Sequence, residues 1–409
     1  MFQRSTTLTR TAGLQGERQL ILLSAGTAIR RRAMHEQAVG LMADVNWSRL
    51  GHTLRWRRLL PALGPRILEL AGDRASDDFA AAVEQELEAA RRRGVFLQLT
   101  TLRVMNSLAS AGIRCAPLKG PLMGEAIYGD PGRRLSSDID LLVAPEELQT
   151  AVEVVRGLGY EAPNDHVDQQ GLPLLHFAFA HGQRELPPVE LHWRIHWYER
   201  NFSRERLLPP TVDSQSAWRP ARADELAALL LFYARDGFVD LRLASDLSGW
   251  WDTFGAEVQI GALDELLCAY PAFARVIPVA VRVAERIVGL PAAQIIGNMP
   301  KLGLRDRMAV RLADPNPRAS QHQLFADTGL IDGLLAPPGG LGTFIRRKVV
   351  LPREILEENA RREGAQRVKS TPGYSLRILV RFGLALIQMV RGPERLRRES
   401  FTAVESSSL

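Results

Sequence analysis

The sequence predicts an α+β fold in which a small mixed sheet is flanked by N-terminal and C-terminal helical regions. Short strand-like segments separated by Gly and Pro gather between residues 111 and 200, and helical apolar periods lie on both sides of them. With 409 residues, the chain is too long for one small core. We expect a helical region over 1–95, the sheet domain over 96–205, a helical domain over 206–335, and a linker with a basic helical tail over 336–409.

Helices are expected over residues 18–110. The stretch 59–63 interrupts them with a proline, and a long helical period then runs from 77 to 108. Ser76 or Asp77 would cap this long helix. Helices return over 223–300, including one over 241–254, and the Gly/Pro-rich stretch 336–340 is the clearest linker.

The expected strands alternate with turns and short helices. A strand over 112–118 is broken at Lys119, a helix covers 122–128 and a turn covers 129–132. An apolar strand follows at 139–143, and a helix over 145–158 ends at Gly159. A strand over 174–180 should form a hairpin with a strictly alternating strand over 189–197.

Two carboxylates stand one residue apart where the apolar strand begins. Because side chains in a strand have a period of two, Asp138 and Asp140 should point to the same side. Adjacent carboxylates repel one another unless a cation lies between them, so removing either one should relieve repulsion in the metal-free protein. Mg²⁺ is commonly bound by one or two carboxylates together with substrate phosphates. The segment therefore indicates part of a metal–nucleotide site.

Lys119 and Gly120 lie where a strand passes into a helix. Free backbone N–H groups and the helix dipole favour a phosphate at such a junction. A solvated lysine at a strand end is the plainer interpretation of Lys119.

A third carboxylate lies on the polar face of the alternating strand. Glu190 shares that face with His192 and His196, and a neighbouring strand would aim it at the same metals. Three carboxylates can hold two divalent ions about 3.5–4 Å apart for phosphoryl displacement. A zinc site using Glu190 and the two histidines is an alternative, although it lacks a clear fourth ligand.

Taken together, these motifs resemble the polymerase-β-type nucleotidyltransferase superfamily, and within it a bacterial branch of "nucleotidyltransferase family" proteins. The resemblance covers roughly residues 95–200. Most members of the superfamily have Gly-Ser at the position where this chain, like the bacterial branch, has Lys119-Gly120. A histidine that usually precedes the branch's Leu-Arg-x-x-x-Asp stretch is also missing, although residues 241–246 fit that stretch. The matching residues are Leu118, Lys119 and Gly120; Arg134, Ser137, Asp138, Asp140, Leu141, Leu142 and Val143; and Glu190, Leu191, His192 and Trp193.

The resemblance implies an enzyme that transfers a nucleoside monophosphate from an NTP, such as ATP, to an acceptor and releases pyrophosphate. Asp138, Asp140 and Glu190 would be the catalytic metal ligands, with two Mg²⁺ ions. Lys119, Gly120, Arg134 and Ser137 would bind the nucleotide; Arg134 would contact a phosphate or brace its loop, and Asp246 would orient a basic residue or the nucleotide.

The acceptor is open. A hydroxyl or phosphate on a small molecule, peptide or protein is the leading expectation. RNA is an alternative, and so is a degenerate transferase fold that acts as an interaction protein.

Composition bounds the class of protein. Apolar content of 46% and charged content of 24% are ordinary for a globular protein. Two cysteines indicate neither a disulfide framework nor a zinc cluster. No signal peptide or apolar run of transmembrane length is evident, so we expect a cytoplasmic protein.

Charge is concentrated near the end of the chain. Residues 345–400 carry a net charge of +8, against +6 for the whole chain. Within them, 376–390 is apolar and helix-like, with Arg377 and Arg381 inside it. This pattern favours a helix packed on the protein body; contact with an anionic membrane surface or with RNA is the alternative.

Overall fold

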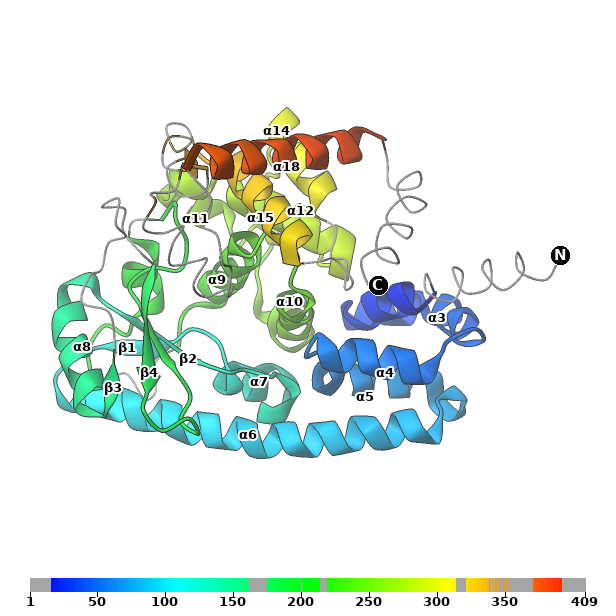
Figure 1. Ribbon diagram of the computed structural model, residues 1–409, viewed down its shortest axis with the longest axis horizontal. Coiled ribbons are helices and arrows are strands. Elements are labelled where there is room, and N and C mark those ends of the chain that lie inside the picture. The colour runs from blue at the N-terminus through cyan, green and yellow to red at the C-terminus, as the bar shows by residue number, and fades with distance from the viewer. Residues whose placement is uncertain are drawn as a thin grey trace.

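The computed structural model describes residues 16–161, 175–199, 201–213, 219–313, 321–337 and 371–391, with a few residues between 340 and 353. Position 174 of the expected hairpin and positions 338–339 of the expected linker lie outside these ranges. The α+β prediction is confirmed: a five-stranded mixed sheet lies between helical regions (Figure 1).

The N-terminal helical region contains a connection with unusual backbone geometry. Among the described residues its helices include α2 (Ala28–Ala33), α3 (His35–Met42), α4 (Trp47–Trp56) and α5 (Leu60–Ala71). The helices break at residues 57–59, between α4 and α5. The predicted interruption over 59–63 is wrong beyond residue 59, because residues 60–63 begin α5 and Pro61 occupies its first turn, where its missing N–H costs nothing. Arg58, in this connection, has a φ of 58°, which non-glycine residues rarely adopt.

Helix α6 (Asp77–Ser110) joins two hydrophobic cores (Figure 1). The Ser76 hydroxyl accepts a hydrogen bond from the Phe79 N–H at 3.2 Å, so the expected cap is confirmed. Phe79 packs in the large helical core, whereas Leu108 packs in the core beneath the sheet. The boundary expected between residues 95 and 96 falls inside α6, and the division into domains stays a prediction.

The sheet has the strand order β1-β2-β5-β4-β3. Strand β2 pairs with β5 in parallel, and the other neighbours pair in an antiparallel manner, which includes the predicted hairpin. The strands are β1 (Cys115–Pro117), β2 (Ile139–Val143), β3 (Tyr160–Glu161), β4 (His176–His181) and β5 (Val189–His192).

The two faces of β2 enter different cores. Ile139, Leu141 and Val143 pack with α6 and with α8 (Leu148–Gly157), whereas Leu142 packs in the large helical core. Asp140 lies on the Leu142 face because the strand period is two. The alternation of β2 therefore sets the carboxylates on the side of the sheet that faces the helical core.

The expected strand over 189–197 is wrong beyond His192. After His192 the chain turns, and the backbone N–H groups of Ile195 and His196 donate to the Glu199 carboxylate. Glu199 is buried and also accepts from the Ser203 N–H at 2.8 Å. The backbone N–H groups of this segment therefore donate to a buried carboxylate instead of to a neighbouring strand. The helix expected over 145–158 is likewise divided, into a 3₁₀ turn η3 (Pro145–Glu147) and α8 (Leu148–Gly157).

Helices α9 and α10 cover the carboxylate side of the sheet region, and further helices pack behind them (Figure 1). Helix α7 joins the sheet region to α10, and a Cβ on Gly249 of α10 would lie 2.7 Å from the Tyr128 ring. These helices are α7 (Pro121–Tyr128), α9 (Arg222–Arg235), α10 (Leu241–Phe254), α11 (Asp264–Ala269), α12 (Val276–Val288), α13 (Ala292–Ile295), α14 (Leu304–Leu312) and α15 (Gln321–Leu335). Shorter turns are η1 (Gly72–Arg74), η2 (Pro131–Arg133), η4 (Ser203–Leu207), η5 (Gly255–Glu257) and η6 (Pro271–Phe273).

The helical part of the basic tail packs on the body. Helix α18 (Thr371–Arg391) crosses α15, and its Ile378 and Phe382 are buried in a small cluster with Leu330 (Figure 1). Leu376 on its other side is 65% exposed. Across the described ranges, every helix is too short or too polar to cross a bilayer.

Candidate active site

Three carboxylates meet where β2 and β5 run side by side. Asp140 and Glu190 are paired across the two parallel strands, and Asp138 directly precedes β2. One carboxylate oxygen from each of the three lies within 4.8 Å of the others. The structure therefore brings together the three expected metal ligands; their role as ligands stays a prediction.

Asp140 is held ionised by its surroundings. Its side chain is 2% exposed, and Oδ1 lies 3.2 Å from Lys119 Nζ and 3.0 Å from His192 Nε2. Burial alone would raise the pKa of Asp140, but the contacts with His192 and Lys119 hold that pKa well below its usual range. Asp140 thus carries its negative charge at neutral pH.

Glu190 is more accessible, with 22% of its side chain exposed. Burial opposes its ionisation, yet the hydrogen bond from His192 and the nearby His176 lower the pKa of Glu190. Both carboxylates are therefore available to a cation in their ionised form.

His192 contributes more than the strand alternation indicated. It is fully buried, and its Nε2 lies 3.2 Å from Glu190 Oε2 as well as close to Asp140. His176 stands opposite His192 across β4 and β5, with Nε2 3.5 Å from Glu190 Oε2. The sequence predicted His192 as a neighbour of Glu190 that matches the family and as a ligand in the zinc alternative, and it indicated no role for His176. The signal was the two-residue spacing from Glu190 to His192; nothing in the sequence pairs β4 with β5 in this register.

Gly120 and Lys119 form the expected strand-to-helix junction. Gly120 precedes α7 with a φ of 97° and a ψ of −158°, a conformation that glycine alone adopts without strain. Lys119 extends to Asp140 and lies 5.4 Å from the Phe232 ring of α9. The expected phosphate-binding lysine is therefore part of the carboxylate cluster in the absence of nucleotide.

Arg134 is engaged by the protein itself. Its Nε donates to Asp246 Oδ2 at 2.8 Å, and its Nη1 donates to Ser136 Oγ at 2.7 Å, with 9% of the side chain exposed. Of the two roles considered for Arg134, this geometry favours bracing the loop over contacting a phosphate. Asp246 correspondingly orients a basic residue.

Asp246 and Arg134 belong to a buried polar set that we call the bracing network. Tyr128 places its hydroxyl 3.2 Å from Ser245 Oγ and 3.3 Å from Asp246 Oδ1. Arg66 of α5 reaches the same Ser245 hydroxyl at 3.2 Å. The network thus ties α5, α7, α10 and the loop before β2 into one frame. Its members are Arg66, Tyr128, Arg134, Ser245 and Asp246.

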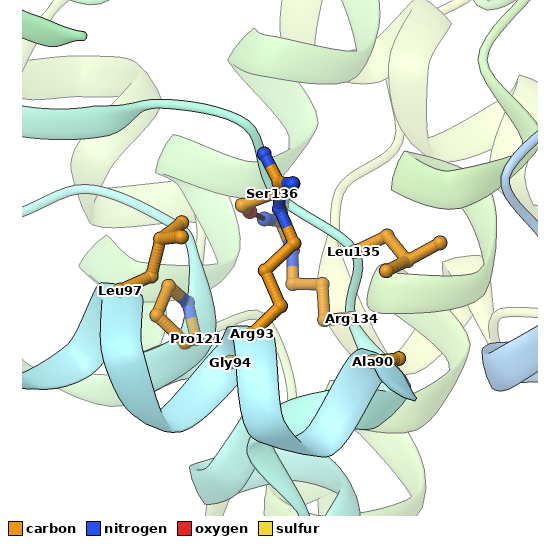
Figure 2. A pocket seen from close by; sticks show the side chains of 8 residues that line it. All are labelled: Ala90, Arg93, Gly94, Leu97, Pro121, Arg134, Leu135 and Ser136. Atoms are coloured by element: carbon orange, nitrogen blue, oxygen red, sulfur yellow. Dashed lines mark hydrogen bonds between the residues drawn. The ribbon is translucent and has the colours of Figure 1, made fainter. Parts of the chain in front are cut away.

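Two arginines that were not expected from the sequence lie beside the loop before β2, and Arg58 is close enough to Asp138 for their charges to attract. Arg58 Nη1 lies 3.5 Å from Ser137 Oγ. Burial lowers the pKa of Arg58, and the positive charges of Arg242 and Arg93 lower it further. Figure 2 shows Arg93 rising from α6 beside Arg134 and Ser136, which line the same small pocket.

These two arginines also differ from their charged neighbours. Arg134 and Arg242 are paired with Asp246 and Asp240, whereas Arg58 and Arg93 form no ion pair with a described carboxylate. Sequence alone could not find them, because Arg58 in the α4–α5 connection and Arg93 in α6 precede the sheet by many residues.

Comparison with known proteins agrees with this arrangement. A family model described as "uncharacterised nucleotidyltransferase" matches residues 43–286. The match includes the sheet, the α4–α5 connection with Arg58, helix α6 with Arg93, and α9 to α10. Neither the curated proteins nor the solved structures contain a match. The chain therefore belongs to this uncharacterised nucleotidyltransferase family and is an enzyme that transfers nucleotidyl groups.

Proposed function

We propose that this enzyme is a Mg²⁺-dependent nucleotidyltransferase. It would transfer a nucleoside monophosphate from an NTP to a hydroxyl or phosphate on a small molecule, peptide or protein. The observation that carries the proposal is the convergence of Asp138, Asp140 and Glu190 on adjacent strands, with one oxygen of each within 4.8 Å. An all-oxygen donor set of this charge fits hard divalent ions.

The carboxylates would hold two Mg²⁺ ions, one through all three side chains and one through Asp138 and Asp140. Mg²⁺ bound there would supply Lewis-acid stabilisation of the phosphoryl oxygens and lower the pKa of the acceptor hydroxyl. Asp138 and Glu190 retain partial exposure, so nucleotide and acceptor can approach them, whereas Asp140 is fixed from below by His192.

The outer phosphates would be bound by cations that surround the carboxylates. Lys119 would exchange its contact with Asp140 for a β- or γ-phosphate oxygen, because metal ions would then neutralise Asp140. Arg58 and Arg93 form no ion pair with a described carboxylate, and they would bind the same phosphates on the side of Ser137. The N–H groups at the start of α7 beside Gly120 would add hydrogen bonds.

The reaction then follows from position and charge. The acceptor oxygen forms a bond to the α-phosphorus as the bond from that phosphorus to the bridging oxygen of the β-phosphate breaks, and pyrophosphate leaves. The acceptor hydroxyl's proton passes to Glu190 or to water. The cations at Lys119, Arg58 and Arg93 stabilise the charge that develops on the leaving pyrophosphate.

The test is transfer from labelled NTPs. The protein is incubated with each of the four α-labelled NTPs and Mg²⁺, alone and with host extract, while pyrophosphate and label on an acceptor are followed. An Asp138→Asn variant serves as the inactive control. Equal pyrophosphate release by the wild-type protein and Asp138→Asn, or no release by either protein with any of the four NTPs, would reject the proposal.

RNA is a second candidate acceptor, because residues 345–400 carry a net charge of +8. Binding of RNA through this segment should weaken steeply as salt is raised. Labelled RNA as the acceptor in the same assay, together with salt-dependent binding, would favour this candidate. The expected cytoplasmic location stays a prediction.

A further inference from the structure

A second potential metal site adjoins the three carboxylates and uses nitrogen ligands. His176, Glu190 and His192 place one ligand atom each within 4.8 Å of one another. His176 and His192 are paired residues of β4 and β5, and their rings lie 4.6 Å apart with an interplanar angle of 34°. Both rings direct Nε2 to the same Glu190 oxygen.

The spacing of these atoms matches a small tetrahedral ion. Ligand atoms about 2.0–2.1 Å from a tetrahedral Zn²⁺ lie about 3.3 Å from each other. The two distances from Glu190 Oε2 are 3.2 Å to His192 Nε2 and 3.5 Å to His176 Nε2. Little movement would therefore convert these contacts into coordination of a single ion.

The donor set also differs chemically from its neighbour. Asp138 and Asp140 offer only oxygen, which suits Mg²⁺, whereas two imidazoles and one carboxylate suit zinc-class ions. His192 is completely buried and held by the sheet, so its nitrogen is already positioned. His196, which the sequence suggested as a zinc ligand, instead turns Nδ1 to the Tyr198 N–H at 3.3 Å.

We propose that His176, Glu190 and His192 form a binding site for Zn²⁺ or a similar divalent transition ion, with Glu190 shared between this site and the carboxylate site. Through Glu190 the inference rests partly on the proposed function, but metal binding can be measured without nucleotide, so the two can fail separately.

The experiment measures metal affinity of the chelator-treated full chain. Zn²⁺ and Mg²⁺ are titrated by calorimetry, and Co²⁺ is used as a visible-absorption probe of tetrahedral geometry. All proteins carry Cys268→Ser, because Cys268 is an exposed thiol that could bind zinc. The variants are His176→Ala, His192→Gln and Asp138→Asn, with His181→Ala on the same strand as the matched control.

His176→Ala should weaken Zn²⁺ binding at least about tenfold and reduce the tetrahedral Co²⁺ bands, with Mg²⁺ binding unchanged. Asp138→Asn and His181→Ala should retain the Zn²⁺ affinity. Because a variant of the buried His192 can lose its fold, circular dichroism accompanies each titration, and His176→Ala alone decides the outcome if His192→Gln unfolds. Equal Zn²⁺ affinity in His176→Ala and the parent, or loss only in Asp138→Asn, would overturn the proposal.

Discussion

Two charged clusters on either side of the loop before β2 differ in how their charges are balanced. In the bracing network, the buried Asp246 is paired with Arg134, although burial still raises the pKa of Asp246. In the carboxylate cluster, three carboxylates contact one lysine and the imidazoles of His176 and His192, with Arg58 attracted to Asp138 at longer range, and two of the three are partly exposed. Buried and compensated charge maintains structure, whereas uncompensated and accessible charge marks where a ligand completes the balance.

The largest expected effect is loss of transfer when either aspartate is removed. Asp138→Ala and Asp140→Ala should each reduce pyrophosphate release to background, because each removes a ligand proposed for both ions. Their stabilities should differ. Asp138→Ala should leave the metal-free unfolding free energy equal or higher, as carboxylate repulsion predicts.

Asp140→Ala should instead lower the unfolding free energy, because Lys119 and the buried His192 lose their partner. Denaturant titration without metal measures both variants. Wild-type turnover in either one, or equal stability changes in both, would contradict the contrast between the two aspartates.

The bracing network should show the opposite profile. Asp246→Ala should cost about 3–5 kcal/mol of unfolding free energy, because it leaves the buried Arg134 unpaired. Replacing both partners together, as Arg134→Met with Asp246→Leu, should recover much of that loss. Denaturant unfolding of the two single variants and the double variant gives the coupling. An Asp246→Ala protein of normal stability but impaired KM would show that this pair contacts nucleotide.

Lys119 combines a structural contact with a proposed binding role, since it neutralises Asp140 and is proposed to bind phosphate. Lys119→Ala should weaken NTP binding by about 1.5–3 kcal/mol, which corresponds to a KM that is roughly 10- to 150-fold higher. Affinity for the nucleoside monophosphate should barely change, because that ligand lacks the outer phosphates. Steady-state kinetics and monophosphate binding test this. Equal weakening of both ligands would assign Lys119 to holding the carboxylates.

Arg93 and Arg92 offer a matched pair on α6. Arg92 is exposed and bound to Glu88, whereas Arg93 lines the pocket beside Ser136. Arg93→Ala should raise KM for the NTP about tenfold, equivalent to about 1.4 kcal/mol, and Arg92→Ala should leave it unchanged. Similar KM values for both variants would remove Arg93 from the proposed phosphate site.

The last expected effect concerns the acid stability of the metal-free protein. Burial and the neighbouring His192 lower the pKa of His176 from 6.5 to about 4. Between these values the unfolded chain binds more protons than the folded one, so stability is complete above about pH 6.5 and declines towards pH 4. His176→Gln should reduce this decline relative to His181→Gln. Unfolding free energies measured from pH 7 to pH 4 would show parallel curves if His176 were not responsible.

Local sequence patterns were sufficient to predict many of the helices and strands and the carboxylates of the candidate site. The Ser76 cap, the long period of α6, and the alternation at β2 and β5 are local signals, and each produced the element that they predict. The aspartate spacing placed Asp138 and Asp140 on one side by the strand period alone. The strand beyond His192 was wrong because a distant buried acid, Glu199, captured its backbone.

By itself, the sequence determined which side chains share a strand face and where strands and helices begin, because these depend on neighbours within a few residues. The tertiary structure decided which faces meet. Only the β4–β5 register brings His176 to His192, and only the packing of α6 and the α4–α5 connection on the loop before β2 brings Arg93 and Arg58 to that loop. Such contacts join residues far apart in the chain, and their partners are selected by the burial of whole helices and strands rather than by any local pattern.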